Sequence, residues 1–277
     1  MSAEQPRVGF IGLGHQGRPM ADRMIECGVR PLLWARRAEI LDPYRETEAR
    51  IAASPAEVGA TCDVIGLCLY DDAATDAVLF GPDGIMTTVR AGTVIAVHAT
   101  VGPDYVIDLA RRVAEAGVRV VDAPVSGADA ARAGELLVIL GDEDGDGARC
   151  APMFDAYASR VVRVGGLGAA QTAKLLNNAL MAATTGLVFD LFELAGELGL
   201  DSSALGEVVA NGSGACYAVN VYRAVGDART LSVRAWPTLH KDVDLLGKVT
   251  AGQQVAEPSL PGVAAATIRQ MVRRRTD

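Results

Sequence analysis

A glycine-rich turn near the N-terminus constrains the fold more than any other feature of the chain. Gly12, Gly14 and Gly17 form the pattern G-x-G-x-x-G between an apolar run, residues 8–11, and a helical pattern over about residues 19–27. Between a strand and a helix, the first glycine permits the tight turn, the second lets the backbone approach a pyrophosphate, and the third allows close packing. The pattern therefore predicts dinucleotide binding at the helix N-terminus, with an ordinary glycine turn as the alternative.

Short apolar runs alternate with helical patterns along the first part of the chain. The helical pattern over residues 105–116, for example, ends at Gly117. This alternation predicts a parallel sheet with helices on both faces. Runs that are almost entirely apolar are typical of strands buried on both faces. The predicted strands are residues 8–11, 31–34, 64–69, 93–97, 118–121 and 136–140.

The pattern becomes helical throughout after about residue 164. Residues 171–198 form one long helical pattern, roughly 40 Å at about 1.5 Å per residue, and Gly199 stands where a helix stop is expected. We predict the α/β class with an N-terminal Rossmann-type doubly wound sheet, a long interdomain helix and an all-α C-terminal domain. The predicted domains are residues 1–165 and 166–277. The remaining helices are predicted over about residues 202–211, 213–226, 236–252 and 259–275.

Composition and charge exclude several classes of protein. The net charge is −8 and the one dense basic run is residues 273–275, whereas a nucleic-acid surface needs clustered cations. Five scattered cysteines without CxxC spacing fit reduced thiols better than disulfides or a zinc site. The first strand leaves no room for a signal peptide, and the apolar run 179–189 is too short to cross a bilayer. We expect a soluble, cytoplasmic protein that binds neither nucleic acid nor membranes.

The end of the second predicted strand indicates which dinucleotide is bound. NAD sites place a carboxylate there to bind the ribose 2′-hydroxyl. This chain instead has Arg36 and Arg37, with no carboxylate before Glu39. A guanidinium offers paired donors to a phosphate, so these residues favour NADP(H) over NAD(H). The alternative is two solvated arginines.

Lysine is rare in this chain, which makes each lysine informative. The 26 basic residues include only Lys174, Lys241 and Lys248 as lysines. Arginine stays protonated, whereas a desolvated lysine can exchange a proton, so a proton-transfer role permits lysine and excludes arginine. Lys174 and Asn178 are four residues apart and share a helix face, with Asn177 adjacent. This group is either an active site or a surface lysine beside two helical asparagines.

Five ordered segments together resemble the β-hydroxyacid dehydrogenase family, which includes 3-hydroxyisobutyrate dehydrogenase and belongs to the 6-phosphogluconate dehydrogenase superfamily. The resemblance covers nearly the whole chain. The matching segments are residues 9–14 with Gly17, Pro19 and Met20; residues 99–101 with Pro103; residues 122–127; Gly165 and Gly168 leading to Lys174, Asn177 and Asn178; and Lys241-Asp242 with Leu245.

The resemblance implies an NADP(H)-dependent dehydrogenase that interconverts a small 3-hydroxy acid and its semialdehyde or 3-oxo acid. Lys174 would be the general acid/base, and Asn178 would orient the substrate oxygen. The substrate carboxylate would lie against Ser126 and Gly127, with Asn177 nearby. Asp242 is either the partner of Lys241 or an ordinary helix carboxylate. The implied cofactor site comprises Gly12, Leu13, Gly14, Gly17, Arg36, Arg37, Leu69, Thr100 and Lys241.

Several departures from the family pattern leave the substrate open. Ala128 and Ala170 replace usual glycines, Asp129 follows Ala128, and His98-Ala99 stands where an acidic residue or serine is frequent. An imine reductase of the same superfamily is one alternative, although such enzymes usually have Asp or Tyr at the position of Lys174. A non-catalytic NADP-binding module is another. We expect no metal site, and the resemblance implies a homodimer or homotetramer.

Overall fold

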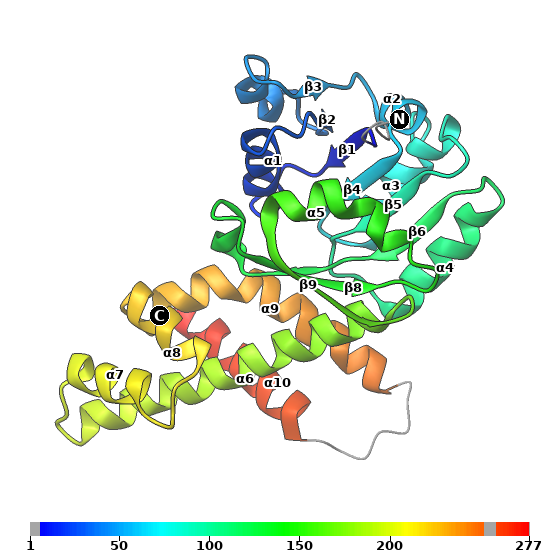
Figure 1. Ribbon diagram of the computed structural model, residues 1–277. Helices are drawn as coiled ribbons and strands as arrows, with labels where there is room; N and C mark the ends of the chain where they lie inside the picture. Colours follow the sequence, from blue (N-terminus) through cyan, green and yellow to red (C-terminus); the bar gives the residue numbers. More distant parts are fainter. Residues whose placement is uncertain (1–5, 252–258, 277) are drawn as a thin grey trace. The chain divides into compact units, whose positions relative to one another are not determined.

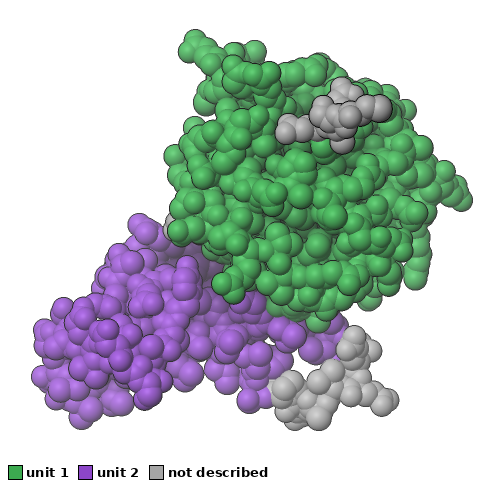
Figure 2. All heavy atoms as spheres, in the orientation of Figure 1, with its two compact units in different colours: residues 1–174 green, residues 175–277 purple. Residues whose placement is uncertain are grey.

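The computed structural model describes residues 6–251 and 259–276. The chain divides into two compact units, residues 1–174 and residues 175–277 (Figure 2). Each unit has its own hydrophobic core: two clusters of buried side chains lie in the first unit and two in the second.

The first unit contains a nine-stranded sheet whose strand order is β3-β2-β1-β4-β5-β6-β8-β7, with β9 paired to β8 (Figure 1). Six strands lie within two residues of their predicted positions: β1 (Val8–Ile11), β2 (Leu32–Trp34), β4 (Val64–Leu67), β5 (Val94–Val97), β6 (Arg119–Asp122) and β8 (Leu136–Gly141). Three strands were not predicted: β3 (Arg50–Ile51), β7 (Val125–Ser126) and β9 (Ala158–Gly165).

The strands from β3 to β6 are all parallel, which confirms the Rossmann-type arrangement. Strand β8 runs antiparallel to both β6 and β7, so the sheet is mixed at this edge. Because the chain crosses from β3 to β4 on the other side of β1, the strand order reverses between β1 and β4. Open α/β sheets bind ligands at the carboxyl ends of the strands beside such a reversal.

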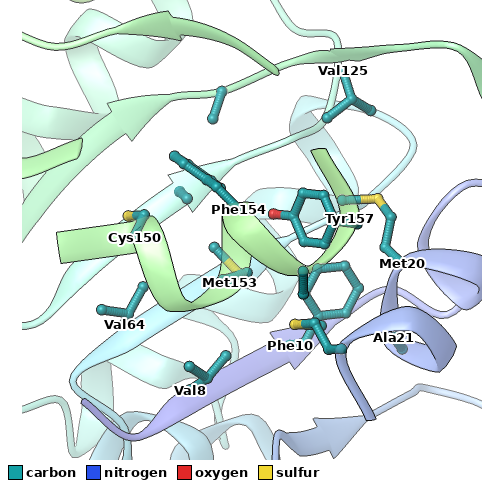
Figure 3. Packing of buried hydrophobic residues seen from close by; sticks show 14 of the residues in the cluster. Val8, Phe10, Met20, Ala21, Val64, Val125, Cys150, Met153, Phe154 and Tyr157 are labelled. Carbon is teal, nitrogen blue, oxygen red and sulfur yellow. The ribbon is translucent and has the colours of Figure 1, made fainter. Parts of the chain in front are cut away.

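Helices cover both faces of the sheet because successive strand side chains point to opposite faces. Phe10 joins the core cluster that contains side chains of α1 (Gly17–Glu26) and α5 (Ala151–Tyr157), while Ile11 joins the cluster that contains side chains of α2 (Pro55–Thr61) and α4 (Pro103–Ala114). Figure 3 shows Phe10 packed with Met20 of α1 and Tyr157 of α5. The remaining helix of this unit is α3 (Asp72–Phe80), and short 3-10 turns are η1 (Ala38–Tyr44), η2 (Ile85–Thr87), η3 (Ala128–Ala131) and η4 (Asp146–Cys150).

A single helix, α6 (Ala169–Glu197), begins in the first unit and continues into the second. It lies at the predicted position and is followed by Gly199, whose φ of +72° is the left-handed conformation that glycine adopts most easily. By length and composition the helix could cross a membrane: an 18-residue window has a mean hydropathy of 1.4, and half of that window is buried. A helix at the core of a unit meets the same criteria, and Leu175, Ala179 and Phe189 are buried in the core of the second unit.

The described residues of the second unit form helices joined by short loops, with no strand among them, as predicted. Helix α9 starts earlier than the predicted residue 236 and contains Pro237 within it. Helices α9 and α10 pack against each other, and their buried side chains share a core with α6. The helices after α6 are α7 (Ser202–Asn211), α8 (Tyr217–Val225), α9 (Ala228–Ala251) and α10 (Ser259–Thr276).

Candidate active site

The glycine turn between β1 and α1 has the geometry that the sequence pattern predicts. Gly12 has a φ of +103°, and a Cβ atom there would lie 2.1 Å from the carbonyl oxygen of Cys68. A Cβ atom on Gly17 would lie 1.9 Å from the carbonyl oxygen of Gly12. A Cβ atom on Gly14, by contrast, would meet nothing within 4 Å. The first and third glycines are therefore required by the fold, while the second leaves open space beside the backbone.

The N-terminus of α1 can accept an anion. Its N-cap residue, Gln16, makes no capping hydrogen bond, and the first turn contains no acidic residue, within the part of the chain that the structure describes. Free backbone N–H groups and the positive end of the helix dipole therefore face the open side of the turn. The turn also follows β1 at the reversal of strand order. These features fit a dinucleotide pyrophosphate.

The two arginines after β2 differ in their surroundings. Both side chains are exposed, and Arg37 Nε lies 4.0 Å from Glu39 Oε1. Arg36 makes no ion pair with any described residue. Arg36 is therefore the cation that remains available at the carboxyl end of β2, where the adenosine ribose of a bound dinucleotide would lie.

The segments after β4 and β5 contain the other predicted cofactor residues of the first unit. Leu69, after β4, packs partly buried against the core on the α4 face, while Leu13, in the turn after β1, is buried. Thr100 is half-buried in the segment between β5 and α4. Both segments leave the carboxyl ends of their strands, which are neighbours of β1 or of its partner β4.

His98, at one of the positions where the sequence departs from the family pattern, is a buried hydrogen-bonding residue. Its Nδ1 lies 2.7 Å from the carbonyl oxygen of Ala123, and its Nε2 lies 3.0 Å from the hydroxyl of Tyr157. Because a carbonyl only accepts, Nδ1 carries the proton and Nε2 accepts from Tyr157. Burial lowers the pKa of His98 from 6.5 to about 4, so the ring is neutral in the folded protein.

This lowered pKa predicts a pH-dependent stability. Below pH 6.5 the unfolded chain protonates His98 while the folded protein does not, so its contribution to stability is present above pH 6.5 and is lost as the pH falls toward 4. Between pH 7 and pH 5, the free energy of unfolding measured with urea should fall by about 2 kcal/mol more in the wild type than in a His98→Gln variant. The exposed His15 provides the control: His15→Gln should behave as the wild type. An unchanged pH dependence in His98→Gln would contradict this assignment.

Ser126 and Gly127, the predicted carboxylate-binding residues, lie four and five positions after the end of β6. Ser126 ends the short strand β7 and is half-buried. Gly127 has a φ of +102°, which side chains rarely allow. The side chains of Ala128 and Asp129, where the sequence departs from the family pattern, lie outside the described residues.

Lys174 lies in the second turn of α6, and the start of that helix is fixed to the sheet. The residue is only 8% exposed. The backbone N–H of Gln171 donates to Asp122 Oδ2 at 3.0 Å, and the Gln171 side chain bonds to the segment that contains Thr100. Burial raises the pKa of the Asp122 carboxyl, although N–H groups at the start of α6 act in the opposite direction. The first unit thus ties Lys174's helix to the carboxyl ends of β5 and β6.

The predicted residues of the second unit form one hydrogen-bonded group. Asn178 Nδ2 donates to Asp242 Oδ2 at 2.5 Å, and Asn177 Nδ2 donates to Asn178 Oδ1 at 3.0 Å. Lys241 Nζ lies 3.2 Å from Asp242 Oδ1, and Asp242 is completely buried. Asp242 is therefore the ion-pair partner of Lys241, one of the two alternatives that the sequence left open, and it also orients the amide of Asn178.

Two residues of these networks had no role in the sequence analysis. Asp122 is the first residue of a segment that resembles the family, and Gln171 is the first residue of the long predicted helix, but the sequence suggested no function for either. The available signal was their polarity at positions that the pattern otherwise places in the core. No group of three or more His, Cys, Asp or Glu side chains that could hold a metal ion occurs in residues 6–251 and 259–276.

Comparison with protein families covers both units. Residues 7–166 match the NAD binding domain of 6-phosphogluconate dehydrogenase, and residues 168–276 match the NAD-binding domain of NADP-dependent 3-hydroxyisobutyrate dehydrogenase. Mouse mitochondrial 3-hydroxyisobutyrate dehydrogenase is 32% identical over 226 residues, which are 81% of this chain and 67% of the mouse protein. The chain belongs to the β-hydroxyacid dehydrogenase family. This β-hydroxyacid dehydrogenase is also 38% identical over 207 residues to an uncharacterized oxidoreductase of Mycobacterium tuberculosis, covering 74% of this chain and 70% of that one.

Solved structures share the fold of this β-hydroxyacid dehydrogenase at lower identity. The M. tuberculosis 3-hydroxyisobutyrate dehydrogenase, solved with L-serine, has a TM-score of 0.82 at 21% identity and covers 99% of this chain and 95% of its own. Psf3, in complex with NADP+ and 2-OPP, has a TM-score of 0.83 at 23% identity, with coverages of 95% and 93%. An imine reductase of Streptomyces aurantiacus has a TM-score of 0.65 at 20% identity, with coverages of 96% and 93%.

Proposed function

We propose that this β-hydroxyacid dehydrogenase interconverts a small 3-hydroxy acid and its semialdehyde or 3-oxo acid with NADP(H), and that Lys174 is the general acid/base. One observation carries the proposal: Lys174 is buried on a helix whose first turn is bonded to the ends of β5 and β6. In a Rossmann-type unit the reacting half of a dinucleotide binds at these strand ends. A buried amine there can exchange protons with a substrate.

Lys174 moves the proton in this mechanism. In the oxidative direction its neutral amine accepts the substrate hydroxyl proton, and in the reductive direction its ammonium returns a proton to the substrate oxygen. The nicotinamide, when bound, accepts or supplies the hydride. Burial favours the neutral form of an amine, so a buried lysine can take both roles where an arginine cannot.

Asn178 and Ser126 orient the substrate in this proposal. Asp242 fixes the Asn178 amide by accepting from its Nδ2, and Asn177 donates to its Oδ1. One N–H of Asn178 is then left to donate to the substrate oxygen. The Ser126 hydroxyl and the backbone at Gly127 bind the substrate carboxylate as donors directed at a fixed anion.

NADP(H) is preferred over NAD(H) in this proposal because Arg36 is available to the 2′-phosphate. Replacing Arg36 with alanine should weaken NADPH binding about 10–100-fold, the usual loss for a charge-assisted hydrogen bond, and leave the Kd for NADH almost unchanged. Fluorescence titration with both cofactors measures this change. Arg37→Ala is the comparison variant: Arg37 is also predicted to bind the cofactor, but it lies near Glu39, so its loss of NADPH affinity should be smaller. Equal losses for NADPH and NADH in Arg36→Ala would refute the role of Arg36.

A self-association surface is also proposed on α6. The helix presents a row of exposed leucines at intervals of four and seven residues: Leu176, Leu180, Leu187 and Leu194. Such spacing places side chains on one face of a helix, and exposed apolar rows of this kind are typical of interfaces. We expect a homodimer or homotetramer, which light scattering of the full chain tests.

A panel of substrates tests the proposed reaction. NADPH consumption should be measured with the semialdehyde of 3-hydroxyisobutyrate, with tartronate semialdehyde and with a cyclic imine, and NADP+ reduction with 3-hydroxyisobutyrate. Turnover of the hydroxy acid or a semialdehyde supports the proposal. Turnover of the imine alone would make the protein an imine reductase. Tight NADPH binding without turnover of any of them would make it a binding module.

A further inference from the structure

The Gln171 side chain binds both backbone groups that flank Thr100. Its Oε1 accepts from the N–H of Val101 at 3.1 Å, and its Nε2 donates to the carbonyl oxygen of Ala99 at 3.1 Å. Gln171 and Val101 are completely buried, and Ala99 is 2% exposed. The primary amide thus pairs with a buried stretch of main chain as a neighbouring strand would.

The segment around Thr100 needs the Gln171 side chain as a partner because the hydrogen bonds of the sheet end before this segment. Beyond β5, the N–H groups of His98 and Ala99 both donate to the carbonyl oxygen of Leu67, at 2.9 and 3.3 Å. The next backbone groups, Ala99 C=O and Val101 N–H, bond to Gln171 instead. A buried backbone group without a partner is costly, so Gln171 stabilises the segment by satisfying one backbone group on each side of Thr100.

Asp122 holds Gln171 from the other side. Its Oδ2 accepts from the backbone N–H of Gln171 at 3.0 Å, which satisfies an otherwise unpaired donor in the first turn of α6. Asp122 is the last residue of β6 and is completely buried. A Cβ atom on Gly141 would lie 1.9 Å from Asp122 Oδ1, so the glycine makes room for this carboxylate. Gln171 is therefore fixed through its main chain to β6 and through its side chain to the segment after β5.

We propose that Gln171, held by Asp122, is a positioning residue that fixes Lys174 relative to Thr100. The inference rests on the proposed role of Lys174. Lys174 comes three positions after Gln171, which is about 4.5 Å along the helix axis and places both on nearly the same face. A displacement of about 1 Å at a reacting group costs about a hundredfold in rate. Gln171 thus lies less than one helical turn from Lys174, whose amine it positions.

Variants of Gln171 separate this role from a general loss of packing. Gln171→Ala removes both side-chain bonds and should lower kcat about 10–100-fold, while the Kd for NADPH changes less than threefold. Gln171→Glu keeps an acceptor for Val101 N–H but, when ionised, loses the donor to Ala99 C=O. A protonated carboxyl restores that donor, so the ratio of Gln171→Glu kcat to wild-type kcat should rise as the pH falls. A side chain that only fills space would not produce this pH signature.

Thr172→Ala is the matched control, because Thr172 lies in the same turn and its hydroxyl donates to Gly168 C=O of its own segment. Competitive acetylation of the full chain adds a readout that does not require turnover. The exposed Lys248 serves as the internal reference. Gln171→Ala should raise the acetylation of Lys174 relative to Lys248 several-fold, and Thr172→Ala should leave the ratio within twofold of wild type.

The outcomes distinguish this inference from the proposed function. If the wild type turns over none of the hydroxy acids or semialdehydes, the proposed function fails, and the Lys174 to Lys248 labelling ratio still decides whether Gln171 positions the lysine. An unchanged labelling ratio in Gln171→Ala overturns the inference. Equal falls in kcat for Gln171→Ala and Thr172→Ala overturn it as well, because they indicate a general disturbance of the turn.

Discussion

Replacing Lys174 with alanine is expected to lower kcat by about 10²–10⁴-fold, the usual contribution of a positioned general acid/base. Binding of NADPH should change little, because the dinucleotide residues of the glycine turn and of β2 are elsewhere on the sheet. Steady-state kinetics with the best substrate of the panel measure kcat, and fluorescence titration measures the Kd for NADPH.

Two further variants show whether proton transfer is the reason for that loss. Lys174→Arg keeps a positive charge but cannot release a proton, so its kcat should be nearly as low as that of Lys174→Ala. Lys248→Ala replaces an exposed lysine and should be as active as the wild type. A Lys174→Arg enzyme with wild-type turnover would show that charge alone suffices, which would rule out Lys174 as the general acid/base.

Alanine at Gly12 and alanine at Gly14 should have opposite effects on stability and binding. Gly12→Ala places a Cβ atom 2.1 Å from Cys68 C=O in a backbone with φ of +103°, so we expect a loss of about 3 kcal/mol or more in the free energy of unfolding. Gly14→Ala meets nothing within 4 Å, and Gly14 is not among the glycines with positive φ. Its stability should match that of the wild type, while NADPH binding falls at least about tenfold, because the added methyl group occupies space needed by the pyrophosphate.

Urea unfolding and NADPH titration of both variants test this contrast. The comparison needs no substrate, so it remains valid whatever the enzyme acts on. A Gly14→Ala variant that binds NADPH as tightly as the wild type would remove the glycine turn from the cofactor site. A Gly12→Ala variant with wild-type stability would show that the turn can adopt another conformation.

Much of the fold follows from local patterns in the sequence. Strands such as β1 and β5 are short apolar runs bounded by turn residues, and α6 is a long uninterrupted helical pattern, so both kinds of element are visible locally. Strands β3 and β7 have two residues each, which is too short for a pattern. Strand β9 is mostly exposed, with valines and arginines in sequence, so it shows no alternation. Because Pro237 lies within α9, the sequence pattern placed the start of that helix too late, at residue 236.

The residues predicted for the site lie in short segments of the chain. The glycine turn, the arginines after β2 and the Lys174-Asn178 pair are all local. The bonds from Gln171 to Ala99 and Val101 span 72 and 70 residues, so only the folded chain reveals them. The hydrogen bond from Asn178 to Asp242 spans 64 residues and was not predicted for the same reason.

The continuity of α6 limits how this protein can be recombined with its relatives. The division between the compact units falls within α6, directly after Lys174. The proposed general acid/base, Lys174, therefore belongs to the first unit, whereas Asn178 of the same helix belongs to the second. A chimera joined at that division would take the lysine from one parent and the amide from the other. Exchange of C-terminal units should therefore place the crossover before Ala169, so that one parent supplies the whole helix.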